Sequence, residues 1–220
     1  MTQNTSMRGT LDQIITNASG LYEGNLIPYF QIVFYKAKNV NHPYHNFRHM
    51  MHVTYLCHDA CQFYANTLNK RQMRTLLIAA LFHDFDHRGT LGEDSLNILL
   101  AIRGIEKYVL PDDKPYLADI IDLIQATEYP YKTASSDLPL SQQIIRDADL
   151  SQSLNSAWIQ QVVFGLSVEK QKKPLEILKS QRDFHQSLKF ATEWAHTLWP
   201  HELIEAKMDE AANLLKILEM

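Results

Sequence analysis

The sequence has little of what builds β-sheets. Its 220 residues include 7 glycines, 8 prolines and 7 valines, against 28 leucines. Few chain breakers and few β-branched residues favour helices over strands, which argues against an all-β or a doubly wound fold. The length suits one domain of about 150–250 residues. We therefore predict a single, compact, all-α domain over residues 1–220, with residues 1–7 as a flexible arm.

Basic stripes and long apolar runs are also missing. The 21 Lys and Arg residues are outnumbered by 25 Asp and Glu residues, for a net charge of −4. A protein that binds duplex nucleic acid or an anionic membrane usually shows a basic stripe. No stretch reaches the roughly 18 apolar residues of a membrane span, and residues 1–6 lack the apolar core of a signal peptide. We expect a cytoplasmic protein that binds neither.

Cysteine is scarce too, and the two present lie close together. Cys57 and Cys61 are four residues apart, so they share one helix face. The cytosol disfavours a disulfide there, and a structural metal site would need further thiolates. We interpret both as small core residues. The short charged run at residues 169–173 is interpreted as a solvated loop.

Apolar spacing and the positions of glycine and proline predict the helices. Residues 44–88 contain neither breaker and should form two long helices joined near residues 66–70. The second contains seven consecutive apolar residues, 76–82, which indicates a helix buried on all sides. Further helices are predicted over residues 11–16, 26–38, 95–109, 116–127, 140–154, 157–164, 175–198 and 202–218.

Histidine is concentrated where the chemistry should lie. Seven of the ten histidines fall between positions 42 and 87. His49 lies on the first long helix, whereas His83 and Asp84 follow the most apolar segment. Asp149 lies in another apolar run, where burial without a partner would be costly. Imidazole and carboxylate together suit zinc, iron, manganese or a mixed pair of metals. A shared metal site explains these four residues better than satisfied core histidines and helix caps do.

Three motifs carry a family resemblance. Residues 44–49 (YHNFRH), 83–90 (HDFDHRGT) and 148–151 (ADLS) resemble the signatures of class I cyclic-nucleotide phosphodiesterases, within the HD superfamily of metal phosphohydrolases. The resemblance implies a helical bundle of the HD type with two divalent metal ions, zinc with magnesium or manganese, or iron. It implies that His49, His83, Asp84 and Asp149 hold the first ion and that Asp84 bridges to the second.

The resemblance also implies a reaction. A hydroxide bridging the two metals would attack the phosphorus of a cyclic nucleotide or a cyclic oligonucleotide. His45 would protonate the leaving group as general acid, and His87 would lie near the phosphate. Glu128 would orient His45 or a metal-bound water. The residues implied to bind the nucleotide are Tyr44, Asn46, Gln181 and Phe184, the last two as a clamp on the base.

Other functions remain compatible with the motifs. One is a nucleotidase or nucleoside-triphosphate phosphohydrolase of the wider HD superfamily, although the motif around His45 favours a phosphodiesterase. Another is a catalytically silent nucleotide-binding module, against which the full ligand set argues. A di-iron oxygenase would need extra histidines such as His52 or His58. The motifs leave the natural substrate, the metals and the oligomeric state open.

Overall fold

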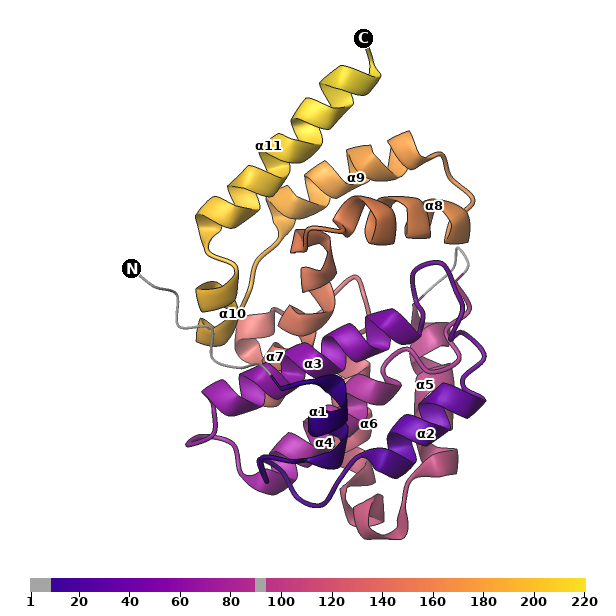
Figure 1. Cartoon of the computed structure of the whole chain (residues 1–220), viewed down its shortest axis with the longest axis vertical. Helices are drawn as coiled ribbons and strands as arrows, with labels where there is room; N and C mark the ends of the chain where they lie inside the picture. The colour runs from indigo at the N-terminus through magenta and orange to yellow at the C-terminus, as the bar shows by residue number, and fades with distance from the viewer. Residues whose placement is uncertain (1–8, 90–93) are drawn as a thin grey trace.

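The computed structural model describes residues 9–89 and 94–220, and it has no strand within those ranges (Figure 1). The all-α prediction is therefore confirmed, while the predicted arm over residues 1–7 lies outside the described residues. The α-helices are α1 Leu11–Thr16, α2 Ile27–Lys36, α3 Phe47–Phe63, α4 Lys70–Phe82, α5 Ser95–Tyr108, α6 Leu117–Ala126, α7 Leu140–Leu150, α8 Gly165–Glu169, α9 Pro174–Ser187, α10 Glu193–Leu198 and α11 His201–Leu218. The 3₁₀ turns are η1 Pro111–Tyr116, η2 Ser135–Asp137 and η3 Ser151–Leu154, and η4 Ile159–Phe164 is π-helical.

Helix α4 lies at the centre of the main core. Every residue from Met73 to Phe82 is buried, and α2, α3, α5, α6 and α7 pack around it. The prediction of a helix buried on all sides is confirmed. Cys57 and Cys61 of α3 are free thiols that are fully buried in this core, so their interpretation as core residues is confirmed as well. The residues that follow α4 consequently begin deep inside the protein.

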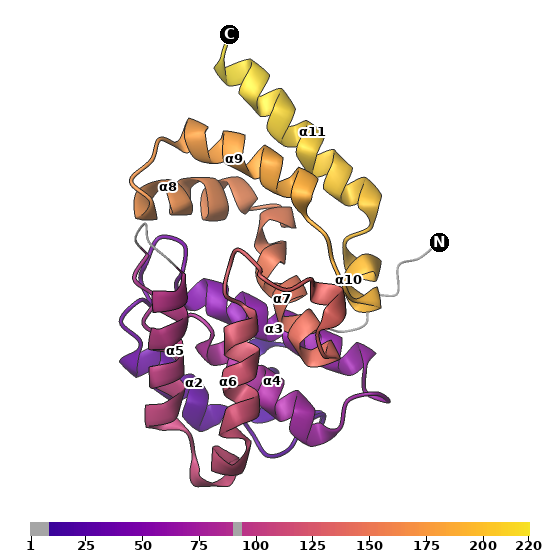
Figure 2. The same cartoon turned by 180° about the vertical axis from the view of Figure 1, so that it is seen from behind.

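A second layer covers one end of this bundle. Helices α8, α9 and α11 lie side by side above the bundle in both views (Figures 1 and 2). Together with η4 they have an apolar core of their own, centred on the buried Trp158. The junction between the two layers brings residues from the first half of the chain against α8 and α9, and the candidate site lies there.

The prediction of one continuous helix over residues 175–198 is wrong. The chain forms α9 and α10 with an extended break between them, and the buried Asp147 of α7 explains the break. Its carboxylate accepts hydrogen bonds from the backbone N–H groups of Ala191 and Thr192 and from the Thr192 hydroxyl. Thr192 then caps α10 by accepting from the N–H of Ala195. The predicted helix 140–154 similarly changes to a 3₁₀ turn after Leu150.

A buried ion-pair network ties η1 to α4 and α2. The carboxylate of Asp113 is fully buried and receives two hydrogen bonds of 2.7 Å from the guanidinium of Arg74. Arg71 and the hydroxyl of Tyr29 each donate a further hydrogen bond of 2.8 Å. Burial alone would raise the pKa of Asp113, but these partners lower it below its ordinary value.

Removing this carboxylate should destabilise the fold. We expect Asp113→Ala to lower the free energy of unfolding at pH 7 by about 3–5 kcal/mol, because it leaves buried guanidinium charge uncompensated. Because the pKa of Asp113 is lower in the folded state, its carboxylate stabilises the protein fully at pH values above the unfolded-state pKa of about 3.9. This contribution is lost as the pH falls through the folded-state pKa. The difference between wild type and variant, measured by urea unfolding at pH 7 and pH 3, should therefore shrink in acid. The exposed neighbour provides the control, since Asp112→Ala should change stability by less than about 0.5 kcal/mol. Equal effects at the two positions would contradict the role of the network.

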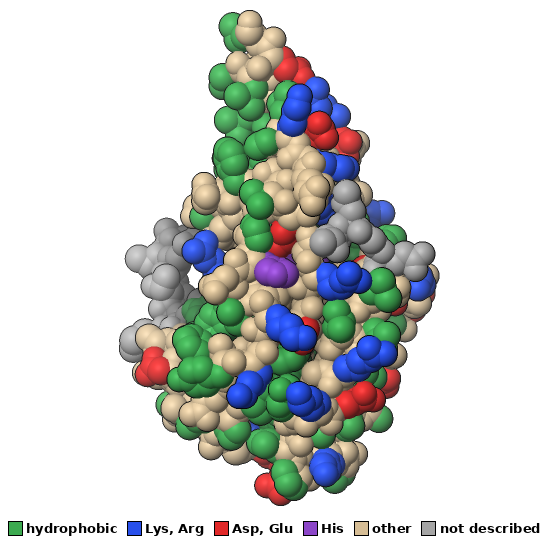
Figure 3. Space-filling model, turned by 90° about the vertical axis from the view of Figure 1, so that its right-hand side faces the viewer, with side chains coloured by type: hydrophobic (Ala, Val, Ile, Leu, Met, Phe, Trp, Pro, Cys, Tyr) green, Lys and Arg blue, Asp and Glu red, His purple; other side chains and the backbone are tan. Residues whose placement is uncertain are grey.

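The outer surface is mixed in character. Among the described residues, no helix has both the length and the apolar composition needed to cross a membrane. Figure 3 shows hydrophobic side chains along the left edge of the upper part of this face, with Lys, Arg, Asp and Glu side chains along its right edge and scattered over the lower part. Ile217 and Leu218 at the end of α11 are more than half exposed.

Candidate metal centre

Three different elements supply the four predicted metal ligands. His49 lies in the first turn of α3, which begins where the side chain of Asn46 accepts a hydrogen bond from the His49 backbone N–H. His83 and Asp84 follow directly after α4, and Asp149 lies in the last turn of α7. The ends of three packed helices therefore converge on one point.

The side-chain atoms of these residues lie close together. The Nε2 atom of His49 is 3.3 Å from Nε2 of His83, 3.4 Å from Asp84 Oδ2 and 3.0 Å from Asp149 Oδ1. The Nε2 atom of His83 is 3.5 Å and 3.6 Å from the same two carboxylate oxygens. The ligand atoms of His49, His83 and Asp149 lie within 4.8 Å of one another, and Asp84 Oδ2 lies beside both imidazoles. Nitrogen and oxygen donors of this kind suit a divalent transition metal.

One polar atom of this cluster has no hydrogen-bond partner within the protein. The Oδ2 atom of Asp84 is buried and has no hydrogen-bond partner, although a buried carboxylate oxygen without a partner is costly. Burial alone would lower the pKa of His49, yet the neighbouring Asp149 and Asp84 raise it to about 9. The site therefore favours positive charge at its centre. The residues fit a divalent cation.

Hydrogen bonds behind the cluster fix the orientation of both histidine rings. The Nδ1–H of His49 donates to the side-chain oxygen of Gln152, and the Nδ1–H of His83 donates to the carbonyl of Ala80 at 2.8 Å. With Nδ1 hydrogen-bonded in this way, the Nε2 atom of each ring faces the centre, which is the atom that such a histidine offers to a metal. Gln152 was not predicted to belong to the site.

His45 has a carboxylate partner that the sequence analysis missed. Its Nδ1 is 2.6 Å from Oε2 of Glu169, whose other oxygen accepts hydrogen bonds of 2.8 Å from the backbone N–H groups of Tyr44 and His45. Glu169 is buried at the end of α8, so its interpretation as part of a solvated loop is wrong. Burial alone would raise its pKa, but the hydrogen bonds with His45 and these amides lower it. Glu128 instead pairs with Lys132 on the surface.

Gly165 allows α8 to lie close to the chain segment that carries Tyr44 and His45. A Cβ atom at Gly165, in the first turn of α8, would lie only 2.8 Å from the carbonyl oxygen of Pro43 and 3.1 Å from Cβ of Tyr44. Gly165 thus lets the chain before α3 pack directly on α8, where Glu169 follows one turn later on the same face.

His87 packs against the face of His45. The two rings are stacked with their centres 3.7 Å apart, and Nδ1 of His87 accepts a hydrogen bond from the N–H of Gly89. Burial and the neighbouring His45 lower the pKa of His87 to about 4. Asp86, in the same motif, points elsewhere: it adopts a φ of 62° and accepts a hydrogen bond from the backbone N–H of Lys38. His83, Asp84 and His87 of this motif therefore lie at the site, whereas Asp86 contacts the neighbouring backbone.

A cavity of about 290 Å³ opens onto these groups. Eight of the ten predicted site residues line it: Tyr44, His45, His49, Asp84, His87, Asp149, Gln181 and Phe184. His83 belongs to the metal-ligand cluster but does not line the cavity. Asn46 does not line the cavity, since its amide caps α3 and donates to the carbonyl of His42. The structure thus brings the predicted catalytic, metal and base-binding residues together, except for Asn46.

The wall formed by α9 and η3 has polar atoms without hydrogen-bond partners. Gln181 and Phe184 lie three residues apart and both face the cavity. The side-chain oxygen of Gln181 and the hydroxyl of Ser153, which also lines the cavity, are buried without a hydrogen-bond partner. A ligand with polar edges and a flat apolar face would complement this wall.

Comparison with known proteins agrees with the resemblance seen in the motifs. The family model of the 3'5'-cyclic nucleotide phosphodiesterases matches residues 44–93. This segment contains the first two motifs, including His45, His49, His83 and Asp84. A search of curated proteins found no significant match. The family match supports a metal-dependent hydrolase of phosphodiester bonds.

Proposed function

We propose that this protein is a metal-dependent phosphodiesterase that hydrolyses a cyclic nucleotide or a cyclic oligonucleotide. One observation carries the proposal: His49, Asp84 and Asp149, with an unpartnered oxygen of Asp84 among them, line the same cavity as His45, whose Nδ1 is held by Glu169. A cation site beside a carboxylate-held histidine is the pairing that cleavage of a phosphodiester needs.

Each side chain has a task in this proposal. His49, His83, Asp84 and Asp149 would hold divalent cations, which when bound would supply a nucleophilic water at neutral pH and neutralise charge on the phosphate. The Nδ1–H of His45 donates a hydrogen bond to Glu169, and its Nε2–H protonates the leaving oxygen. The stacked ring of His87 limits the rotation of His45. Gln181 and Phe184 hold the nucleobase, which orients the scissile bond.

The proposal predicts bound metal and a defined substrate range. Elemental analysis after gentle purification should find at least about one transition metal ion per chain, because four ligands of mixed type release metal slowly. The protein should cleave phosphodiesters from a panel of cyclic mono-, di- and trinucleotides, nucleoside triphosphates and nucleoside monophosphates, tested with zinc, manganese, magnesium and iron.

Other outcomes of the panel select the alternatives. Turnover of the triphosphates or monophosphates alone would identify a nucleotidase or triphosphohydrolase. Nucleotide binding without turnover under any metal would identify a silent binding module. Metal content below about 0.2 per chain would contradict the metal centre itself.

A further inference from the structure

A second cavity adjoins the catalytic one and is larger. Its volume is about 430 Å³, against about 290 Å³ for the cavity at the metal centre. Tyr129, Leu150 and Phe184 line both cavities, so the two are neighbours that share a wall. A ligand that occupies both cavities must therefore pass over these three side chains.

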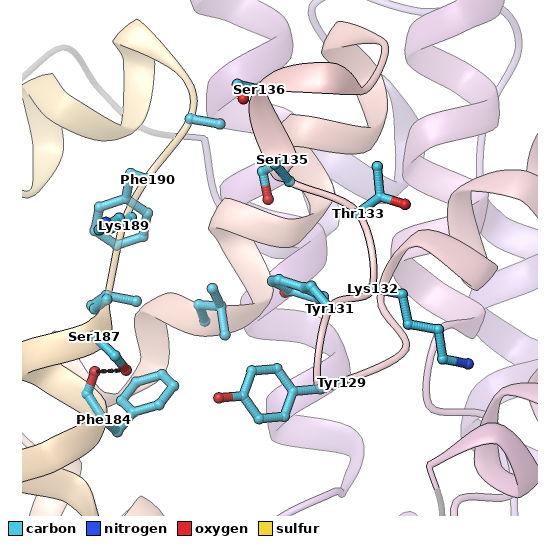
Figure 4. A pocket seen from close by; sticks show the side chains of 14 residues that line it. Tyr129, Tyr131, Lys132, Thr133, Ser135, Ser136, Phe184, Ser187, Lys189 and Phe190 are labelled. Carbon is cyan, nitrogen blue, oxygen red and sulfur yellow. Dashed lines mark hydrogen bonds between the residues drawn. The ribbon is translucent and has the colours of Figure 1, made fainter.

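Two segments form the sides of the second cavity (Figure 4). The loop between α6 and α7 supplies Tyr129 and Tyr131, and the end of α9 with the break after it supplies Phe184 and Phe190. The tyrosine loop is held in place from behind, because the buried Arg146 donates to the carbonyls of Ala126 and Thr133 and packs on the ring of Tyr131. The aromatic walls are thus positioned by the core.

The polar lining of this cavity has one sign of charge. Among the residues that the structure describes, its lining includes two lysines, several hydroxyls and no carboxylate. Lys132 pairs with Glu128 and, in Figure 4, extends away from the cavity. Lys189 is exposed and makes no ion pair within residues 9–89 and 94–220. Aromatic rings beside an unpaired cation suit a base together with a phosphate.

We infer that the second cavity binds a second nucleotide unit, so that the substrate is a dinucleotide whose scissile phosphate lies at the metal centre. This inference rests on the proposed function. The second base stacks on Tyr129 and Phe184, the two lining rings that are exposed or half-buried, because Phe190 is already stacked on Trp199 and Tyr131 is covered by Arg146. The second phosphate lies within reach of Lys189. A cyclic mononucleotide would leave this larger cavity empty.

The test compares substrates on the metal-loaded protein. The value of kcat/KM should be at least about tenfold higher for a dinucleotide than for a cyclic mononucleotide with the same base, since base stacking alone is of that order. Cyclic and linear dinucleotides of adenosine and of guanosine form separate arms, which identify the form that is cleaved. Equal or faster turnover of the cyclic mononucleotide would overturn the inference.

Variants locate the preference in the second cavity. Lys189→Ala should lower kcat/KM for the dinucleotide about three- to tenfold, as expected for a partly exposed charge contact, with Lys189→Arg restoring most of it. Ser187→Trp, at the mouth of the cavity, should block the dinucleotide more strongly. Neither should change turnover of the cyclic mononucleotide. The matched control is Lys216→Ala, an exposed lysine on α11 remote from both cavities. Equal effects on both substrates, or none on either, would overturn the inference.

A binding measurement separates this inference from the proposed function. Calorimetric titration with a cyclic dinucleotide that carries non-hydrolysable phosphorothioate linkages should show binding that weakens in Lys189→Ala and not in Lys216→Ala. Hydrolysis of bis(p-nitrophenyl) phosphate without any preference for dinucleotides would refute the second subsite alone. Failure to cleave any phosphodiester with any metal would refute the proposed function.

Discussion

Replacing Asp84 with asparagine should lower kcat by about 10³-fold or more. Stabilisation of developing charge by metal ions is worth several kcal/mol, and each ~1.36 kcal/mol corresponds to a factor of ten. Oδ2 of Asp84 is buried without a partner and lies 3.4–3.5 Å from the Nε2 atoms of His49 and His83. An amide there would keep the shape of the side chain and lose the negative charge. We therefore expect a loss of bound metal as well as of turnover.

Two other aspartates make this prediction specific. Asp149→Asn should weaken the first metal site, whereas Asp84→Asn should also empty the second, because Asp84 is the proposed bridge. Anomalous scattering from crystals of both variants measures the two occupancies. Asp86→Asn is the matched control, since Asp86 lies two residues from Asp84, contacts Lys38, and has a positive φ that asparagine tolerates. Equal second-site occupancy in the Asp84 and Asp149 variants would refute the bridging role.

Local patterns were sufficient to find the metal cluster. The apolar run of α4 predicted a buried helix, and the two residues that follow it, His83 and Asp84, are consequently buried at the helix end. Asp149 was found by the same reasoning, since it lies in an apolar run, whereas His49 was found from the motif at residues 44–49. Such positions can be predicted from short motifs because a few neighbouring residues determine both the type of side chain and its burial.

Long-range partners were not predictable in this way. Glu169 is separated from His45 by 124 residues, and Gln152 is separated from His49 by 103. Nothing in the charged run that begins at Glu169 marks its first carboxylate as buried, because the burial comes from packing α8 on the chain before α3. The break between α9 and α10 has the same origin, since Asp147 is 45 residues from Thr192.

The same long-range contact carries the second large prediction. His45→Ala should lower kcat for a nucleotide phosphodiester by about 10²–10⁴-fold, the usual contribution of a general acid. Metal content should not change, because the ring of His45 lies beside the four proposed ligands and is held by Glu169. Loss of metal in this variant would instead identify His45 as a ligand. His201→Ala, an exposed histidine on α11, serves as the control.

The leaving group distinguishes an acid from a structural residue. A p-nitrophenolate leaves without needing a proton, so His45→Ala should slow bis(p-nitrophenyl) phosphate far less than it slows a nucleotide substrate. Glu169→Gln should lower kcat on the nucleotide by about 10–100-fold, as expected when a residue that orients another is changed. Because Glu169 acts through His45, the double variant should be no slower than His45→Ala alone. Multiplicative losses in the double variant, or equal losses with both leaving groups, would show that Glu169 and His45 act independently or only support the fold.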